Sequence, residues 1–261
     1  MFLASVDGAV SPPEEARIPV TDEGLLRGDG GFEVVRIYGG RPFAWADHLA
    51  RLQGTCDGLR LEARIDALAE ESLALLERAG EQEALLRLVV TRGGRRIALV
   101  EPLPARPPTA RVMTVTYAPT RVLNGLKTLS YAANMLATRS AKERGFDEAL
   151  LVTPHGRVLE APTSTIFWCT PDGVLATPPL EEHILASITR AYVMEVTGAE
   201  ERVCTKEELE QASEAFLAST TREVQPIAQI EEIEFEAPGE HTRAAAEGLR
   251  ARIQEALAAG V

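Results

Sequence analysis

Hydrophobic positions in the first half of the chain follow two patterns. Short runs of β-branched and aromatic side chains indicate strands, and apolar side chains at helical spacing indicate two helices. The predicted strands are 31–38 (GFEVVRIY), 84–91 (ALLRLVVT) and 110–117 (ARVMTVTY), with a turn-rich, proline-rich segment between the last two, and the predicted helices are 45–59 and 65–79. The pattern therefore predicts an α+β first half.

The second half mixes both patterns after a break. Residues 118–125 have no periodicity and hold a proline, an asparagine and a glycine, so we expect an interdomain linker there, between domains 1–117 and 126–261. Helices are predicted at 131–144, 188–198, 207–212 and 242–259, strands at 166–169, 174–176 and 215–218, and a hairpin within 148–161. This half is predicted to be a mixed α/β domain.

Composition narrows the class of protein. The net charge of −12 repels nucleic acid phosphates and anionic lipid, so neither is an expected partner. The three cysteines are widely spaced and form no metal-binding pattern, so no metal site is predicted. No apolar run approaches the length of a membrane span, and the first residues lack the basic start of a signal peptide. We expect a cytoplasmic enzyme.

Lys127 is the first candidate for chemistry. It lies in an otherwise apolar, strand-like stretch, Leu126 to Leu129, and burial lowers the pKa of a lysine and favours its nucleophilic, neutral form. A Schiff-base lysine needs that property. Taken alone, a lysine at the edge of an element more often extends its amine to solvent.

Three further segments suggest binding of a phosphorylated ring. Glu160 ends a predicted strand, where its carboxylate can hold a pyridine nitrogen protonated, although such glutamates are commonly solvated. Residues 184–190 (ILASITR) open a helix whose first N–H groups suit a phosphate, or are simply capped by a hydroxyl. Residues 219–221 (STT) follow a buried strand and can complete a phosphate site, or form an ordinary turn.

Together these segments resemble one family. The order of Lys127, the run VLE at 158–160, TPP at 177–179, ILxxITR at 184–190 and ST at 219–220 is similar to that of class IV aminotransferases, which use pyridoxal 5'-phosphate. RGDGGFE at 27–33 and HLARL at 48–52 also match, so the resemblance covers about residues 20 to 230. It implies fold type IV, with a small N-terminal α+β domain and a larger C-terminal mixed α/β, barrel-like domain, and a homodimer.

The resemblance also implies roles for individual residues. Lys127 would hold the cofactor covalently and move the proton at the substrate α-carbon, and Glu160 would pair with the pyridine nitrogen. Arg51 would contact the phosphate with its fork of N–H groups, a geometry that arginine supplies better than lysine. The remaining cofactor-binding residues implied are Ile188, Thr189, Ser219, Thr220 and Tyr131. One departure is Thr165, where the family often has asparagine.

Two features favour the D-amino acid transaminases within the family. Ser219-Thr220-Thr221 resembles their second phosphate loop, whereas branched-chain enzymes usually have Gly-Thr-Ala. Val34 stands where the 4-amino-4-deoxychorismate lyases commonly place a threonine that serves the elimination. The turn at 219–221 therefore favours the D-amino acid branch, and Val34 favours a transaminase over a lyase.

Substrate carboxylates need cationic partners. Arg87 interrupts an apolar strand, and Arg27 opens the glycine turn. The resemblance implies a substrate role for both, because a subset of D-amino acid transaminases has arginines at such positions. Arg87 can instead occupy the exposed face of a half-buried strand. Arg36 shares a face with Val34 by strand alternation. The predicted substrate-binding residues are Arg27, Arg87, Phe32, Val34, Arg36 and Thr221.

The sequence thus predicts a transaminase that moves the amino group of a D-amino acid to a 2-oxo acid such as 2-oxoglutarate or pyruvate. The reaction would be ping-pong through the pyridoxamine phosphate form of the cofactor. Alternatives are a 4-amino-4-deoxychorismate lyase, then a branched-chain L-amino acid aminotransferase. A non-catalytic protein that binds the cofactor is disfavoured because it would need neither Lys127 nor Glu160.

Overall fold

The computed structural model describes residues 1–259, which form two compact units. Unit 1 contains Met1–Ala105, Leu126–Tyr131 and the described residues 256–259, and unit 2 contains Arg106–Gly125 and Ala132–Glu255. The units therefore divide the chain elsewhere than the predicted linker at 118–125. The reason is strand pairing, because the strand after Arg106 joins the sheet of unit 2 and the segment around Lys127 joins the sheet of unit 1.

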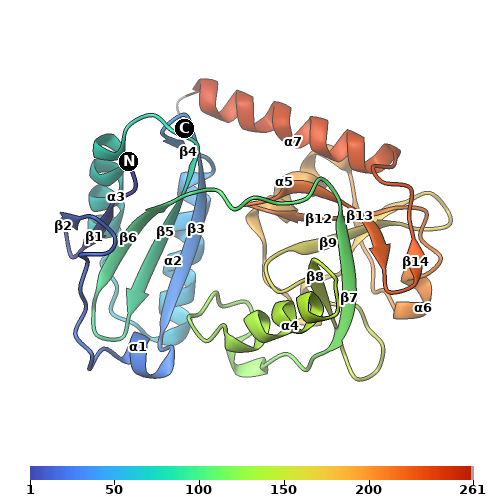
Figure 1. Cartoon of the computed structure of the whole chain (residues 1–261), viewed down its shortest axis with the longest axis horizontal. Helices are drawn as coiled ribbons and strands as arrows, with labels where there is room; N and C mark the ends of the chain where they lie inside the picture. The colour runs from blue at the N-terminus through green and yellow to red at the C-terminus, as the bar shows by residue number, and fades with distance from the viewer. Residues whose placement is uncertain (260–261) are drawn as a thin grey trace. The chain divides into compact units, whose positions relative to one another are not determined.

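Unit 1 is a six-stranded antiparallel sheet, ordered β2-β1-β6-β5-β3-β4, with two long helices on one face (Figure 1). Its strands are β1 (Ala4–Val6), β2 (Ala9–Ser11), β3 (Gly30–Tyr38), β4 (Arg41–Pro42), β5 (Ala84–Thr91) and β6 (Arg96–Glu101), and its helices are α1 (Glu23–Arg27), α2 (Trp45–Leu59) and α3 (Ile65–Ala79). The predicted bounds of α2, α3 and β5 are confirmed, and the core between sheet and helices includes Val35, Ile37, Leu52, Leu68 and Leu86.

Strand β6 corrects the prediction of an irregular segment after residue 91. Arg96–Glu101 pairs with β5 through a tight turn in which Gly94 has a φ of 76°. Ala98 and Val100 are buried against the helices. The short apolar run was hidden by the glycines before it and the prolines after it.

Unit 2 is an eight-stranded mixed sheet, ordered β11-β10-β9-β12-β13-β7-β8, with β14 paired to β13. Its strands are β7 (Ala110–Thr116), β8 (Glu148–Val152), β9 (Thr165–Cys169), β10 (Leu175–Thr177), β11 (Glu200–Glu201), β12 (Ala215–Ser219), β13 (Glu223–Ile230) and β14 (Ile233–Glu234). Its helices are α4 (Ala132–Glu143), α5 (Ile188–Thr197), α6 (Lys206–Leu209) and most of α7 (Glu240–Ala259), with 3₁₀ turns η1 (Arg121–Leu123) and η2 (Leu180–Glu182).

Three strands of this sheet are buried along their whole length. Every residue of β8, β9 and β12 is buried, which is typical of strands covered on both sides. Phe167 and Phe216 stack with ring centroids 4.9 Å apart. The hairpin predicted within 148–161 is confirmed by hydrogen bonds between Leu151 and residues 159 and 160. The mixed two-sheet fold is the predicted fold class.

The described part of the chain, residues 1–259, is without a membrane-spanning helix or a metal-binding cluster. No helix in that range is long and apolar enough to cross a membrane. The same range holds no group of three or more histidine, cysteine or acidic side chains placed to bind a metal ion. The three cysteine thiols are buried and form no disulfide.

Candidate active site

Strand β3 presents different side chains on its two faces because successive residues of a strand point to opposite sides. Val35 and Ile37 are fully buried in the core under α2 and α3. Phe32, Val34 and Arg36 therefore occupy the other face, as predicted for the last two. Arg87 pairs with Val34 in register, so it lies on this second face too.

Lys127 is attached to the end of β3 by a short extended segment. The Phe32 N–H donates to the Lys127 carbonyl at 3.0 Å, and the Leu129 N–H donates to the Gly30 carbonyl at 2.8 Å. The Lys127 N–H donates to Thr55 Oγ1 of α2 at 3.2 Å. Main-chain bonds on both sides thus fix the segment, and alternation places the lysine side chain on the second face of the sheet.

The Lys127 amine lies beside two aromatic rings of unit 1. Its Nζ is 4.4 Å from the centroid of the Phe32 ring and 5.6 Å from that of Tyr131. The two rings meet edge to face, with centroids 5.2 Å apart. The structure therefore brings together three of the predicted site residues, and the rings restrict the positions that the amine can take.

On the helix face, Glu33 holds Arg51 and His48. Arg51 donates from Nε to Glu33 Oε1 at 2.6 Å and from Nη2 to Glu33 Oε2 at 2.7 Å, and His48 Nδ1 lies 2.8 Å from Glu33 Oε2. Glu33 is fully buried. The fork of Arg51 expected to face a phosphate is thus oriented by a carboxylate, to which the sequence reading gave no role.

Burial and pairing act in opposite directions on this cluster. Burial alone would raise the pKa of Glu33, but hydrogen bonds and charge from Arg51 and His48 overcome it and lower the pKa to about 2. Burial is also the main reason that the pKa of His48 is lowered. At neutral pH the cluster consists of a carboxylate, a guanidinium and a neutral imidazole, so its electrostatics are fixed across the physiological range.

The other predicted arginines of unit 1 are all paired. Arg27 lies on the exposed α1 and pairs with Glu23 at 2.5 Å. Arg87 pairs across the strands with Glu101 at 2.7 Å, and its guanidinium lies 5.9 Å from the Phe32 ring centroid. Arg36 pairs with Glu83 at 3.2 Å. Arg87 thus contacts the Lys127 cluster, which consists of Lys127, Phe32 and Tyr131.

In unit 2, Glu160 lies at the approach to helix α5. It follows the buried Leu159, and its Oε1 accepts a hydrogen bond from the Leu185 N–H at 3.2 Å. This bond anchors the carboxylate to the segment that leads into α5. The charge of Glu160 also contributes, after burial, to a raised pKa of Tyr117.

Helix α5 starts with a hydroxyl cap. Ser187 Oγ accepts from the Arg190 N–H at 3.2 Å, so the capping alternative considered for this segment is realised. The N–H groups of Ile188 and Thr189, in the first turn, have no acceptor within the helix and carry its positive dipole end. Although Ser187 caps one N–H group, the N–H groups of Ile188 and Thr189 therefore remain able to bind an anion.

The predicted residues 219–221 form the turn between β12 and β13. The Arg222 N–H donates to the Ser219 carbonyl at 3.1 Å, and the hydroxyls of Ser219 and Thr221 are 3.4 Å apart. Thr220 lies between them at the tip, and Glu223 after the turn has a φ of 55°. Three hydroxyls are thus held at one end of the sheet of unit 2.

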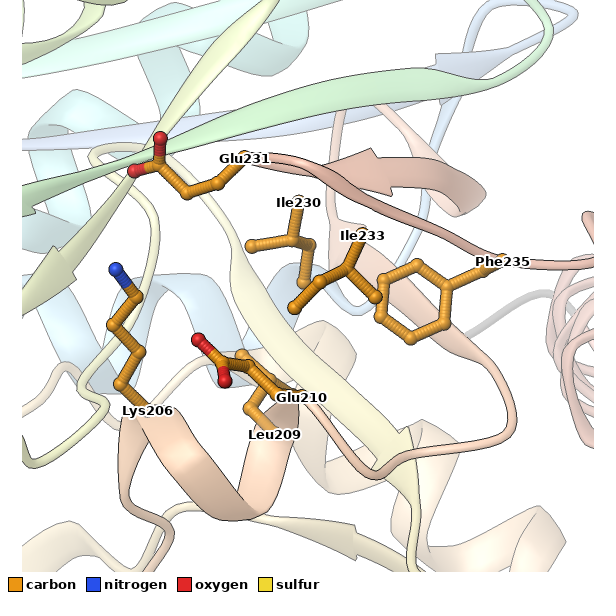
Figure 2. A pocket seen from close by; sticks show the side chains of 7 residues that line it. All are labelled: Lys206, Leu209, Glu210, Ile230, Glu231, Ile233 and Phe235. Carbon is orange, nitrogen blue, oxygen red and sulfur yellow. The ribbon is translucent and has the colours of Figure 1, made fainter.

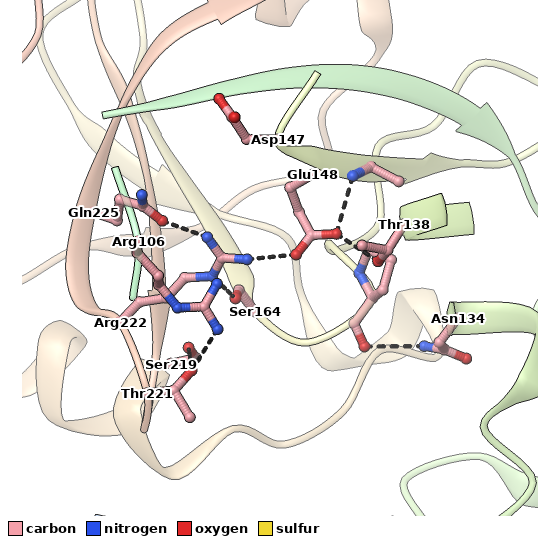
Figure 3. A network of polar contacts seen from close by, with 12 residues as sticks. Arg106, Asn134, Thr138, Asp147, Glu148, Ser164, Ser219, Thr221, Arg222 and Gln225 are labelled. Carbon is pink, nitrogen blue, oxygen red and sulfur yellow. Dashed lines mark hydrogen bonds and ion pairs between the residues drawn. The ribbon is translucent and has the colours of Figure 1, made fainter. Parts of the chain in front are cut away.

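Beneath this turn is a polar network that the sequence reading missed (Figure 3). The Arg222 guanidinium forms a buried ion pair with Glu148, and its Nε donates to Ser164 Oγ at 2.8 Å. Glu148 Oε1 also accepts from Thr138 Oγ1 at 2.6 Å. Burial, and after it the charge of Arg106, lowers the pKa of Arg222 to about 10. The only sequence signal was an acidic residue within the apolar run 148–152.

A separate apolar hollow lies between α6 and the β13–β14 hairpin (Figure 2). Ile230, Ile233 and Phe235 line it, and Lys206 and Glu231 are at its edge. None of the predicted site residues lines this hollow, so it is not part of the candidate site.

Comparison with known proteins gives a consistent result. The family described as amino-transferase class IV matches residues 30–230. A protein of Methanocaldococcus jannaschii named "Putative branched-chain-amino-acid aminotransferase" is 31% identical, with 87% of each chain covered. A D-alanine aminotransferase of Bacillus licheniformis is 29% identical, covering 86% of this chain and 87% of its own.

Solved structures show the same fold. A fold IV transaminase from Curtobacterium pusillum superposes with a TM-score of 0.87 at 27% identity, covering 97% of this chain and all of that one. The branched-chain aminotransferase of Thermoproteus uzoniensis, solved with norvaline, gives a TM-score of 0.88 at 27% identity, covering 97% and 95%.

Proposed function

Because this chain belongs to the class IV aminotransferases, we propose that it moves the amino group of a D-amino acid to a 2-oxo acid such as 2-oxoglutarate or pyruvate. Enzymes of this family use pyridoxal 5'-phosphate, and this chain is a pyridoxal-phosphate-dependent aminotransferase. The observation that carries the proposal is the Lys127 amine packed beside the rings of Phe32 and Tyr131.

The donor set fits the cofactor group by group. A primary amine suits its aldehyde, and the carboxylate of Glu160 suits a protonated ring nitrogen. A phosphate suits the first-turn N–H groups of α5, the hydroxyls of Ser219 and Thr220, and the guanidinium of Arg51. When bound, the cofactor supplies an electron sink for the bonds around the substrate α-carbon.

The protein's own groups then have distinct tasks. Lys127 binds the cofactor and afterwards takes and returns the proton at the substrate α-carbon. Phe32 and Tyr131 restrict the amine and reduce its contact with water. Glu160 holds the proton of the ring nitrogen. Arg87 and Arg27 bind substrate carboxylates, for which each must exchange its present acidic partner. The enzyme acts as a homodimer in the cytoplasm.

Arg51→Ala should lose cofactor far more readily than Arg60→Ala. A charge-assisted phosphate contact is worth ~1.5–3 kcal/mol, which corresponds to a rise of about tenfold or more in the dissociation constant. Arg60 is exposed at the end of α2 and serves as the matched control. Cofactor affinity is measured by fluorescence titration of the apoenzyme. Equal losses in the two variants would remove Arg51 from the phosphate site.

A screen of D- and L-amino acids tests the choice of substrate. The absorbance of the bound cofactor should change with D-alanine or D-glutamate and hardly at all with L-leucine. The relatives of this chain include D-alanine and branched-chain aminotransferases, so both arms are needed. A preference for L-leucine contradicts the stereochemical assignment. Release of pyruvate from aminodeoxychorismate, without response to any D-amino acid, supports the lyase instead.

A further inference from the structure

Arg106 differs from Arg222, the other arginine of the polar network, because its only hydrogen bond in residues 1–259 is to a hydroxyl. Its Nη2 donates to Thr221 Oγ1 at 3.0 Å. No carboxylate in that range lies within ion-pair distance of it, whereas Arg222 has Glu148. Arg106 is exposed, so a ligand can reach it.

The acceptors around Arg106 are already committed. Glu148 accepts from Arg222, Thr138 and the Ala149 N–H. The side-chain oxygen of Gln225 accepts from Arg222, and the Gln225 amide donates to the Pro107 carbonyl at 2.8 Å. That last bond fixes the chain next to Arg106. The remaining N–H donors of Arg106 thus have no acceptor in the network (Figure 3).

Arg106 and Arg222 are two cations close enough to repel each other, while the carboxylates of Glu148 and Asp147 stabilise Arg222. The charge of Arg106 helps to depress the pKa of Arg222, so the two guanidiniums influence each other. An anion placed against Arg106 would relieve this repulsion.

We propose that Arg106 and Thr221 form a subsite that binds a carboxylate of the amino acid or 2-oxo acid substrate. The inference rests on the proposed function, because it takes residues 219–221 as part of the substrate site. A carboxylate suits this place because a guanidinium can bind both of its oxygens while Thr221 keeps the arginine in position. The subsite adds a cation to the predicted pair Arg27 and Arg87, each of which has an acidic partner.

The test compares Arg106→Met, Arg106→Lys and the control Arg144→Met in the holoenzyme. Arg144 is an exposed arginine of unit 2 outside the network. Calorimetry measures the binding of maleate, a dicarboxylate that cannot be aminated, and steady-state kinetics give KM for 2-oxoglutarate and pyruvate. We expect Arg106→Met to raise the maleate Kd and at least one KM about tenfold or more, with partial recovery in Arg106→Lys and no change in the control.

The pattern of KM values identifies the carboxylate. A rise for 2-oxoglutarate alone supports binding of its second carboxylate, and a rise for both acceptors supports binding of the carboxylate next to the keto group. Unchanged maleate Kd and KM values overturn the proposal. A weaker cofactor affinity in Arg106→Met overturns it as well, since Arg106 would then bind phosphate. If the wild type transaminates no amino acid, the proposed function fails while the maleate titration still reports on the subsite.

Discussion

Lys127→Ala should lower transaminase activity by at least about 10³-fold, because no other group of the Lys127 cluster can attach the cofactor covalently. The protein should still fold, since the main-chain bonds of residue 127 remain. Borohydride reduction of the wild-type holoenzyme followed by peptide mass spectrometry should place the cofactor on Lys127. The chain has only two other lysines, so the assignment is unambiguous.

Those two lysines provide the internal control. Lys142 lies in α4, and Lys206 opens the short α6 and lines the hollow of Figure 2. Neither is among the predicted site residues. An adduct on either of them, or normal turnover by Lys127→Ala, would overturn the assignment of the site.

Glu33→Gln should lower the free energy of unfolding by about 3 kcal/mol at pH 7. The pKa of Glu33 is about 2 in the folded protein against an ordinary value of 4.5 for a glutamate, and each unit of difference corresponds to about 1.4 kcal/mol. Since the folded pKa is the lower one, this stabilisation is complete above pH 4.5 and is lost as the pH falls toward 2. Urea unfolding at pH 7 and pH 3 should show the difference from wild type shrink to about 1 kcal/mol.

The control for this experiment is Glu83→Gln. Glu83 also pairs with an arginine, Arg36, but its side chain is 53% exposed, so its removal should change stability little at either pH. A loss in Glu83→Gln equal to that in Glu33→Gln, or a Glu33→Gln loss that does not depend on pH, would contradict the role given to the buried carboxylate.

The spacing of apolar residues was sufficient to predict the bounds of the long helices and strands. Helices α2 and α3 and strand β5 begin and end where the apolar periodicity does. Strands β1 and β2 have three residues each, too few to show a period. Strand β13 contains Pro226, a residue that argues against a central strand, yet it pairs on both sides. Tertiary packing decides such cases, and it is not visible in a short window of sequence.

Some residues of the candidate site were likewise predictable from the sequence, and others were not. The order of motifs located Lys127, Glu160 and the turn at 219–221, because each has a recognisable neighbourhood in the sequence. Partnerships between distant residues were not predictable. Arg222 meets Glu148 from 74 residues away, and Arg51 meets Glu33 across a strand and a helix. From the sequence alone, Arg51 was assigned a phosphate ligand. Glu33, the carboxylate that orients its guanidinium, became visible only in the structure.

Because the backbone around Lys127 is extended, only every second side chain of this segment points to the second face of the sheet, where the Lys127 amine lies. Thr128 bridges Gly31 and is buried on the helix side, while its neighbours on either side point the other way. Exchanging Lys127 and Thr128 would move the lysine by one position along the chain. Its amine would then point to the opposite face of the sheet, on the side of Thr55. An engineer relocating this lysine must therefore move it in steps of two.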